Sequence, residues 1–126
     1  MYAQLQSNKR GQNLLNSIQK NRMLSIFRKL FGSSTDMERL ISGGAILIDV
    51  RTKNEFDAGH INGARHIPLD SLQNRVEELK KINKPVITLC RSGARSSAAK
   101  TILSSAGLEA YNGGAWMAFK NRYALV

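Results

Sequence analysis

Residues 86–99 have the sequence VITLCRSGARSSAA, in which a short apolar run is followed at once by a polar turn that contains two arginines. Residues 86–89 are apolar and β-rich, a pattern that predicts a buried strand. From Ser97 onward, alanine, isoleucine and leucine recur at helical spacing until Gly107, which predicts a helix. The sequence therefore predicts a strand, a tight loop and a helix in succession, with Cys90 at the end of the strand.

Cys90 is the only cysteine of the chain. The predicted loop places its sulfur at the carboxyl edge of a sheet, in front of a helix N-terminus whose free N–H groups and dipole favour negative charge. Arg91 and Arg95 add positive charge. Each of these influences lowers a thiol pKa, and the thiolate is the nucleophilic form of cysteine. The alternative is a buried structural cysteine, but such a polar, basic loop does not suit an apolar core, so we expect a reactive thiol.

Three further motifs accompany this loop. They are LIDVR at residues 47–51, EFDAGHINGARHIPL at residues 55–69 and NGGAW at residues 112–116. Together with CRSGARS at residues 90–96, and in the same order, they resemble the motifs of rhodanese-type sulfurtransferases. The match extends from about Thr35 to Phe119. Asn62 stands where the family usually has proline, a departure that affects a turn and leaves the chemistry unchanged.

The resemblance implies a rhodanese-like α/β fold, with a mostly parallel central sheet of about five strands flanked by helices on both faces. The alternation of apolar strands and helices also indicates an α/β sheet. From the sequence we expect strands at residues 45–50, 64–67, 86–89 and 108–111. We expect helices at residues 35–41, 70–81, 97–107 and 115–120. Residues 112–114 are expected to form a turn beside the mouth of the site.

The resemblance also implies the roles of the site residues. Cys90 would carry the transferred sulfur as a persulfide. The substrate would be bound by Arg91, Ser92, Gly93, Ala94, Arg95 and Ser96, through backbone N–H groups that form an anion nest and through the arginine side chains. Structural residues near the site would be Asp49, Arg51, His60 and Gly113. Asp49 could instead be catalytic and His60 a general base, but the resemblance favours structural roles, and we expect His66 on the surface.

We therefore predict a thiosulfate sulfurtransferase. It would move sulfane sulfur from thiosulfate, or another small anionic donor, through Cys90 to cyanide, a thiol or an acceptor protein. The histidines and Cys90 lack metal-ligand spacing, and we expect no metal, no organic cofactor and no nucleic-acid partner. A non-catalytic persulfide carrier or partner-binding module stays open as an alternative. A cysteine phosphatase is less well supported, because that class places five residues between Cys and Arg and only four separate Cys90 from Arg95.

The chain has 126 residues and a formal net charge of +10, a length that suits one domain with a core. Residues 1–31 hold basic residues and no acid, so we expect a basic extension there, disordered or a short amphipathic helix, before a domain at residues 32–126. Residues 22–31 could pack on the domain or on a sister chain, which we favour, or contact an anionic membrane.

One cysteine and no apolar run of bilayer-spanning length suit the reducing cytoplasm.

Overall fold

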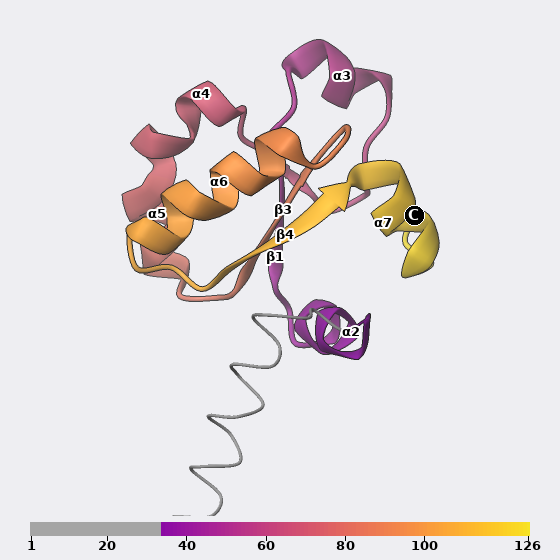
Figure 1. Ribbon diagram of the computed structural model, residues 1–126, viewed down its shortest axis with the longest axis horizontal. Coiled ribbons are helices and arrows are strands. Elements are labelled where there is room, and N and C mark those ends of the chain that lie inside the picture. Colours follow the sequence, from indigo (N-terminus) through magenta and orange to yellow (C-terminus); the bar gives the residue numbers. More distant parts are fainter. Residues whose placement is uncertain (1–33) are drawn as a thin grey trace, which may run out of the picture. The chain divides into compact units, whose positions relative to one another are not determined.

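The computed structural model describes residues 34–126, so the basic extension predicted at residues 1–31 lies outside the described residues. Within the described part, the sheet has four parallel strands in the order β2-β1-β3-β4 (Figure 1). The strands are β1 (Ile46–Asp49), β2 (Arg65–His66), β3 (Val86–Cys90) and β4 (Ala110–Ala115). The α/β fold with a parallel central sheet is confirmed. The expected number of about five strands is wrong, because the remaining segments of residues 34–126 form helices and turns.

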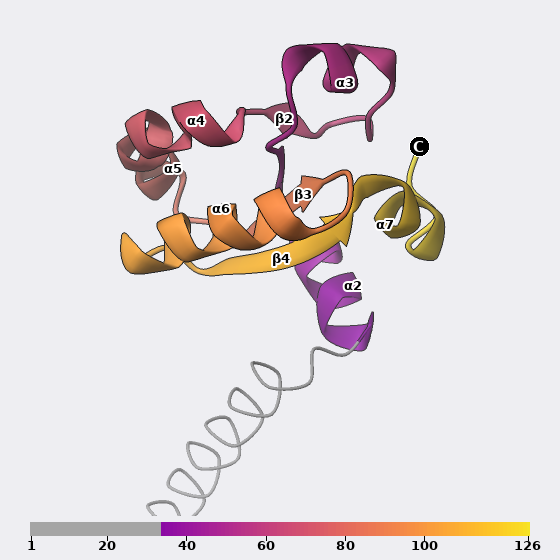
Figure 2. The ribbon, with the colours of Figure 1, turned by 45° about the horizontal axis from the view of Figure 1, so that its top comes forward.

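Helices and turns connect the strands. They are α2 (Ser34–Ser42), α3 (Lys53–Ala58), α4 (Leu69–Leu72), the 3-10 helix η1 (Gln73–Arg75), α5 (Val76–Ile82), α6 (Ala94–Ser105) and α7 (Trp116–Arg122). Helix α6 packs on β3 and β4, and α4 contacts α6. Both views show α4, α5 and α6 grouped together, with α7 at the end of β4 (Figures 1 and 2). No helix among residues 34–126 is both long enough and apolar enough to cross a bilayer.

Strand β3 is the centre of the core, and all five of its residues are buried. Successive side chains of a strand point to opposite faces of a sheet. Val86 and Cys90 belong to the hydrophobic cluster that includes Ala99 and Leu103 of α6. Ile87 and Leu89 alternate with them and are also buried, so both faces of β3 are covered. A strand buried on both faces has a continuous apolar sequence, which accounts for the VITLC run.

The single helix predicted at residues 70–81 is divided, since η1 separates α4 from α5. Its predicted inner face is confirmed, because Leu72, Val76 and Leu79 are all buried. These three side chains belong to the same cluster as Val86 and Leu103. The segment between β2 and β3 therefore covers the face of the sheet on which α6 also packs.

Strand β4 is longer than predicted, and the prediction of a turn at residues 112–114 is wrong. Thr88 is paired with Asn112 and Leu89 with Gly114, which leaves Gly113 as the extra residue of a β-bulge. A Cβ atom on Gly113 would lie 2.6 Å from Leu89 Cδ2 and 2.8 Å from Ile87 Cγ2. Only glycine therefore allows β4 to stay this close to β3 through the bulge.

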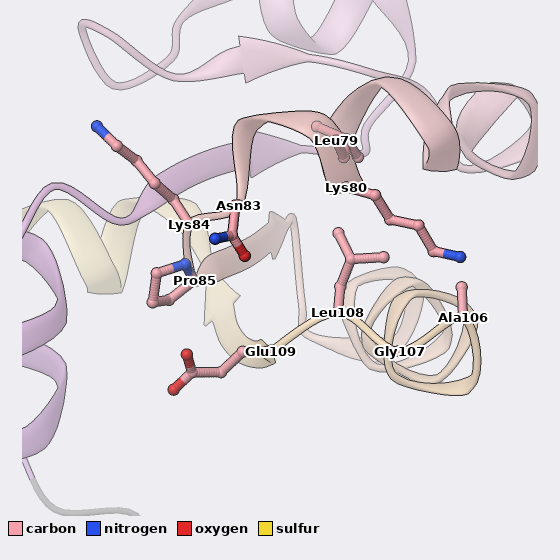
Figure 3. Close-up of a pocket in the computed structure, with 9 residues that line it drawn as sticks. All are labelled: Leu79, Lys80, Asn83, Lys84, Pro85, Ala106, Gly107, Leu108 and Glu109. Atoms are coloured by element: carbon pink, nitrogen blue, oxygen red, sulfur yellow. The ribbon is translucent and has the colours of Figure 1, made fainter.

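A cavity of about 400 Å³ lies at the amino-terminal ends of β3 and β4 (Figure 3). In this view the side chain of Leu108 points toward α5, which carries Leu79. The residues just before the two strands, 83–85 and 107–109, form much of the cavity lining. Because Cys90 is the last residue of β3, this cavity opens at the opposite edge of the parallel sheet from the predicted site.

Candidate active site

The turn from β3 into α6 occupies only residues 91–93, and α6 begins at Ala94 rather than at the predicted Ser97. Gly93 precedes the helix with a φ of 103°, a left-handed conformation that glycine adopts without steric cost. This conformation lets the chain turn directly from strand to helix. Ser96 consequently lies in the first turn of α6, where it is fully buried.

The sulfur of Cys90 is buried and hydrogen-bonded within this turn. The backbone N–H of Gly93 donates to Sγ at 2.9 Å, and Ser96 Oγ lies 3.2 Å from Sγ. Burial by itself would raise the pKa of the Cys90 thiol. Hydrogen bonds from the Ser96 side chain and from the backbone of Ser96, Gly93 and Ser92 outweigh burial, so the pKa is lower than for an ordinary cysteine. The site therefore favours a thiolate mainly by hydrogen bonding, rather than through the arginines that the sequence emphasises.

Arg95 forms a two-point ion pair with Glu55 of α3. Nη1 of Arg95 donates to Oε1 of Glu55 at 2.6 Å, and Nη2 donates to Oε2 at 2.9 Å. The hydrogen bond from Arg95 is the main reason that the pKa of Glu55 falls to about 2. The same bond, together with the negative charges of Glu55 and Cys90, raises the pKa of Arg95. Sequence patterns do not reveal this pair, because its members are 40 residues apart.

Arg91 is exposed and borders a groove of about 390 Å³. The other residues along the groove are Arg51, Glu55, Ala58, Gly59, Trp116 and Met117. Met117 is 60% exposed, and the guanidinium carbon of Arg51 lies 4.5 Å from the centroid of the Trp116 ring. The groove thus has a cation, Arg91, which is the residue that follows Cys90, and apolar side chains, Trp116 and Met117.

Asp49 and Arg51 form a buried ion pair at the end of β1. Nε of Arg51 donates to Asp49 Oδ1 and Oδ2 at 2.9 and 3.0 Å, and Nη2 donates to Oδ2 at 2.7 Å. Arg51 also donates to the backbone carbonyls of Glu55 at 3.2 Å and Gly59 at 2.7 Å. The pair therefore ties α3 and the residues after it to the sheet. These contacts support the structural role proposed for both residues.

His60 and His66 both stack on the ring of Phe56, with centroid distances of 3.7 and 4.5 Å. Nδ1 of His60 lies 2.7 Å from the Phe56 carbonyl oxygen, and Nε2 of His66 lies 2.7 Å from the Arg51 carbonyl oxygen. The prediction of a surface position for His66 is wrong. His66 is half-buried, because its ring stacks on Phe56 of α3. Among the described residues, no cluster of three or more His, Cys, Asp or Glu side chains could hold a metal ion.

Two polar residues that are not among the predicted site residues lie against Ser96. Thr88 Oγ1 donates to the backbone oxygen of Ser96 at 2.7 Å, and Ser96 Oγ donates to Asn112 Oδ1 at 2.6 Å. Thr88 has a weak sequence signal, as the polar residue within an apolar strand. Asn112 belongs to the NGGAW motif that the sequence places beside the site, but no role is predicted for its side chain, which is set opposite Thr88 by the pairing of β3 with β4.

Comparison with protein families agrees with this geometry. The family described as "Rhodanese-like domain" matches residues 33–122. The chain belongs to the rhodanese-like family. Its matched region contains every strand of the described part and the whole Cys90 loop.

The curated relatives include proteins that are named as sulfurtransferases. Thiosulfate sulfurtransferase GlpE of Ectopseudomonas mendocina (strain ymp) is 31% identical over 84 residues, which cover 67% of this chain and 74% of that protein. The uncharacterized protein YqhL of Bacillus subtilis (strain 168) is 48% identical over 69 residues, 54% of each chain. The putative sulfur carrier protein YrkF of the same organism is 35% identical over 63 residues, 50% of this chain and 34% of YrkF. The chain thus spans about half the length of YqhL and a third of YrkF.

Solved structures of the family have the same fold. The human single-domain sulfurtransferase TSTD1 superposes with a TM-score of 0.55 at 30% identity, covering 68% of this chain and 88% of that chain. A rhodanese from E. coli, solved with anions, superposes with a TM-score of 0.54 at 32% identity, covering 59% and 89%. The fold of this chain is therefore the one that these single-domain rhodanese proteins share.

Proposed function

We propose that this chain transfers sulfane sulfur from thiosulfate to a thiophilic acceptor through a persulfide on Cys90. The observation that carries the proposal is the buried Cys90 sulfur, which accepts the Gly93 N–H and lies against Ser96 in a turn of three residues. Hydrogen-bond donors aimed at one atom stabilise the negative charge that develops there. The family and the relatives named as sulfurtransferases support the same class of reaction.

In the first half-reaction, the Cys90 thiol loses its proton to solvent and the thiolate attacks the outer sulfur of thiosulfate. A sulfur–sulfur bond forms to Cys90, the sulfur–sulfur bond within thiosulfate breaks, and sulfite leaves with the bonding electron pair. Arg91, exposed beside Cys90, binds the anionic donor and the departing sulfite. Arg95 adds positive charge from the first turn of α6. Its attraction for the anionic donor is weakened by the ion pair with Glu55.

In the second half-reaction, cyanide or a thiolate attacks the outer sulfur of the persulfide. The new bond forms to that sulfur, the persulfide bond breaks, and Cys90 leaves as a thiolate ready for another cycle. Two half-reactions that share a covalent intermediate give ping-pong kinetics.

A reactive thiol of this kind needs reducing surroundings, so we place the protein in the cytoplasm. An acceptor protein thiol is compatible with the same step.

A persulfide carrier is the second candidate, because one relative, YrkF, is named as a putative sulfur carrier. A carrier would keep the fold and the Cys90 persulfide but would receive its sulfur from a protein donor rather than from thiosulfate. The two candidates therefore differ in which donor loads Cys90. A cysteine phosphatase would instead hydrolyse an aryl phosphate at the same thiol.

The test is an assay of the purified protein with thiosulfate and cyanide, beside an aryl phosphate, for wild type and Cys90→Ser. We expect thiocyanate formation by wild type, no phosphate release, and loss of at least a hundredfold in the serine variant. Intact mass should rise by one sulfur when wild type meets thiosulfate alone. Equal activity of the two proteins would refute the role of Cys90. Loading only by a protein persulfide would favour the carrier, and phosphate release would favour the phosphatase.

A further inference from the structure

The hydroxyl group of Ser96 has one hydrogen and three neighbours that can accept it. Asn112 Oδ1 lies 2.6 Å from Ser96 Oγ, the Gly93 carbonyl oxygen lies at 3.0 Å, and the Cys90 sulfur lies at 3.2 Å. A serine hydroxyl donates one hydrogen bond and accepts others. The three contacts therefore compete for a single proton.

The backbone N–H of Gly114 shows which side-chain atom of Asn112, oxygen or nitrogen, faces Ser96. The N–H of Gly114, which can only donate, lies 2.9 Å from the same Asn112 atom. That atom is therefore the amide oxygen, and Ser96 must donate to it. The side-chain nitrogen of Asn112 lies on the other side, 3.4 Å from the Gly93 carbonyl oxygen. Both contacts fix the amide in one orientation.

It follows that the Ser96 hydroxyl hydrogen points at Asn112 and not at Cys90. The contact between Cys90 and Ser96 is then made by the thiol hydrogen, which donates to Ser96 Oγ. This is the arrangement of the neutral thiol, and the hydrogen bond from the Ser96 side chain that lowers the thiol pKa is one that only the thiolate accepts. A thiolate has no hydrogen to donate, so it gains a bond from Ser96 only if the hydroxyl turns away from Asn112.

We propose that Asn112 is a positioning residue that holds the Ser96 hydroxyl away from the Cys90 sulfur while that sulfur is a thiol. When Cys90 ionises, the hydroxyl leaves Asn112 and donates to the sulfur, and the proposal rests on the proposed function in taking Cys90 as the nucleophile. Asn112 thereby sets the pH above which the sulfur becomes reactive. Its side chain forms no hydrogen bond with the sulfur and does not line the groove, whereas it does bind Ser96, so it acts through Ser96.

The charged groups around Cys90 come from several elements. Arg91 follows it in the turn, and Arg95 of α6 is paired with Glu55 of α3. Asp49 of β1 is paired with Arg51 at the neighbouring strand end. All these groups are unchanged by a substitution at Asn112. A shift in the titration of Cys90 in such a variant therefore reports the competition for the Ser96 proton.

The experiment measures the rate of alkylation of Cys90 by iodoacetamide against pH, without any sulfur donor. Asn112→Ala removes the nearer of the two oxygen acceptors and leaves only the Gly93 carbonyl oxygen at 3.0 Å, so the midpoint of the rate profile should fall by about half a pH unit to one pH unit. Asn112→Asp makes a stronger, negatively charged acceptor, and its midpoint should rise by about one unit or more. Ser96→Ala removes the donor to the thiolate and should also raise the midpoint.

The decisive comparison combines two substitutions. In the Ser96→Ala background, Asn112→Ala should no longer shift the midpoint, because the two residues act through one proton. The same shift with and without Ser96 would overturn the proposal, as would a rise or no change in the Asn112→Ala single variant. Because alkylation reads the thiol directly, the result stands whether or not thiosulfate proves to be the donor.

Discussion

Arg91 and Arg95 differ in how much of their charge is available to a substrate. Arg91 is exposed at the groove, whereas both ends of the Arg95 guanidinium already bind Glu55. We expect Arg91→Ala to raise the KM for thiosulfate about tenfold or more, since a charge-assisted hydrogen bond contributes roughly 1.5–3 kcal/mol. Arg95→Ala should raise it less. The measurement is steady-state kinetics with thiosulfate varied at fixed cyanide.

The matched control for these variants is Lys81→Ala, which removes an exposed cation from α5. It should leave KM unchanged, because α5 precedes β3 and so lies away from the edge at which Cys90 emerges. A KM for Arg91→Ala equal to that of the control would show that Arg91 takes no part in donor binding. An Arg95→Ala effect larger than that of Arg91→Ala would mean that Glu55 releases Arg95 when the donor binds.

At the scale of elements, the bulge in β4 depends on Gly113. Gly113→Ala places a Cβ atom within 3 Å of Leu89 and Ile87, both fully buried in β3. Overpacking of this kind costs roughly 1–3 kcal/mol, so the urea midpoint of unfolding should fall. Gly63→Ala is a contrasting control, because Gly63 has a positive φ of 85° but open space around its Cβ position, so its loss of stability reports backbone strain without crowding. An unchanged urea midpoint for Gly113→Ala would mean that Leu89 and Ile87 move aside for the methyl group, and that crowding does not govern the bulge.

Glu55 and Arg95 link α3 to α6, and this link should depend on pH. The pKa of Glu55 is about 2, below its usual value, because Arg95 donates hydrogen bonds to the carboxylate. The pair therefore stabilises the fold above the ordinary carboxyl range and loses that contribution as the pH falls toward 2. At pH 7, Glu55→Gln should cost about 1 kcal/mol, since the pair is partly exposed. The difference from wild type should shrink by pH 2.5.

Urea unfolding at pH 7, 4 and 2.5 measures this difference. Glu77→Gln provides the control, because the Glu77 carboxylate is largely exposed and its contact with Lys80 is long, at 3.5 Å. That substitution should change stability little at any of the three pH values. If wild type were as much more stable than Glu55→Gln at pH 2.5 as at pH 7, the stabilising effect could not come from the Glu55–Arg95 ion pair.

The elements that the sequence predicts well are those whose signal is local. The VITLC run, the apolar spacing of Leu72, Val76 and Leu79, and the position of Cys90 at the end of a strand all appear in the structure where they are expected. The start of α6 and the extent of β4 are missed, because each depends on one glycine. Gly93 allows an immediate turn into the helix, and Gly113 allows a strand to pass where sequence patterns favour a turn.

The site is predictable only in part for a related reason. Cys90 stands out in the sequence as the only thiol, in a basic loop. Its partners come from distant positions, and Glu55 and Asn112 reach the loop from α3 and β4. Both belong to motifs that accompany the Cys90 loop in the family, but no periodicity or spacing predicts their contacts with residues 90–96. Only the parallel pairing of β1, β3 and β4, which brings three strand ends to one edge, does so.

At the scale of the whole chain, no residue of the segment 1–31 has a role in the predicted sulfur transfer. They contain six basic residues and no acid, whereas all the family motifs and all the described strands lie beyond residue 32. The family match itself begins at residue 33. We therefore expect a chain that starts at Gly32 to fold and to transfer sulfur at the rate of the full chain.

The role of the basic segment is tested on the same two proteins, the full chain and the chain starting at Gly32. Residues 22–31 have apolar side chains at helical spacing, which favours association with a surface. If that surface is a sister chain, truncation should convert a dimer to a monomer in light scattering at equal concentration. If it is an anionic membrane, only the full chain should co-sediment with anionic vesicles, and salt should weaken its binding. Loss of folding or of activity on truncation would show that the domain begins before Gly32.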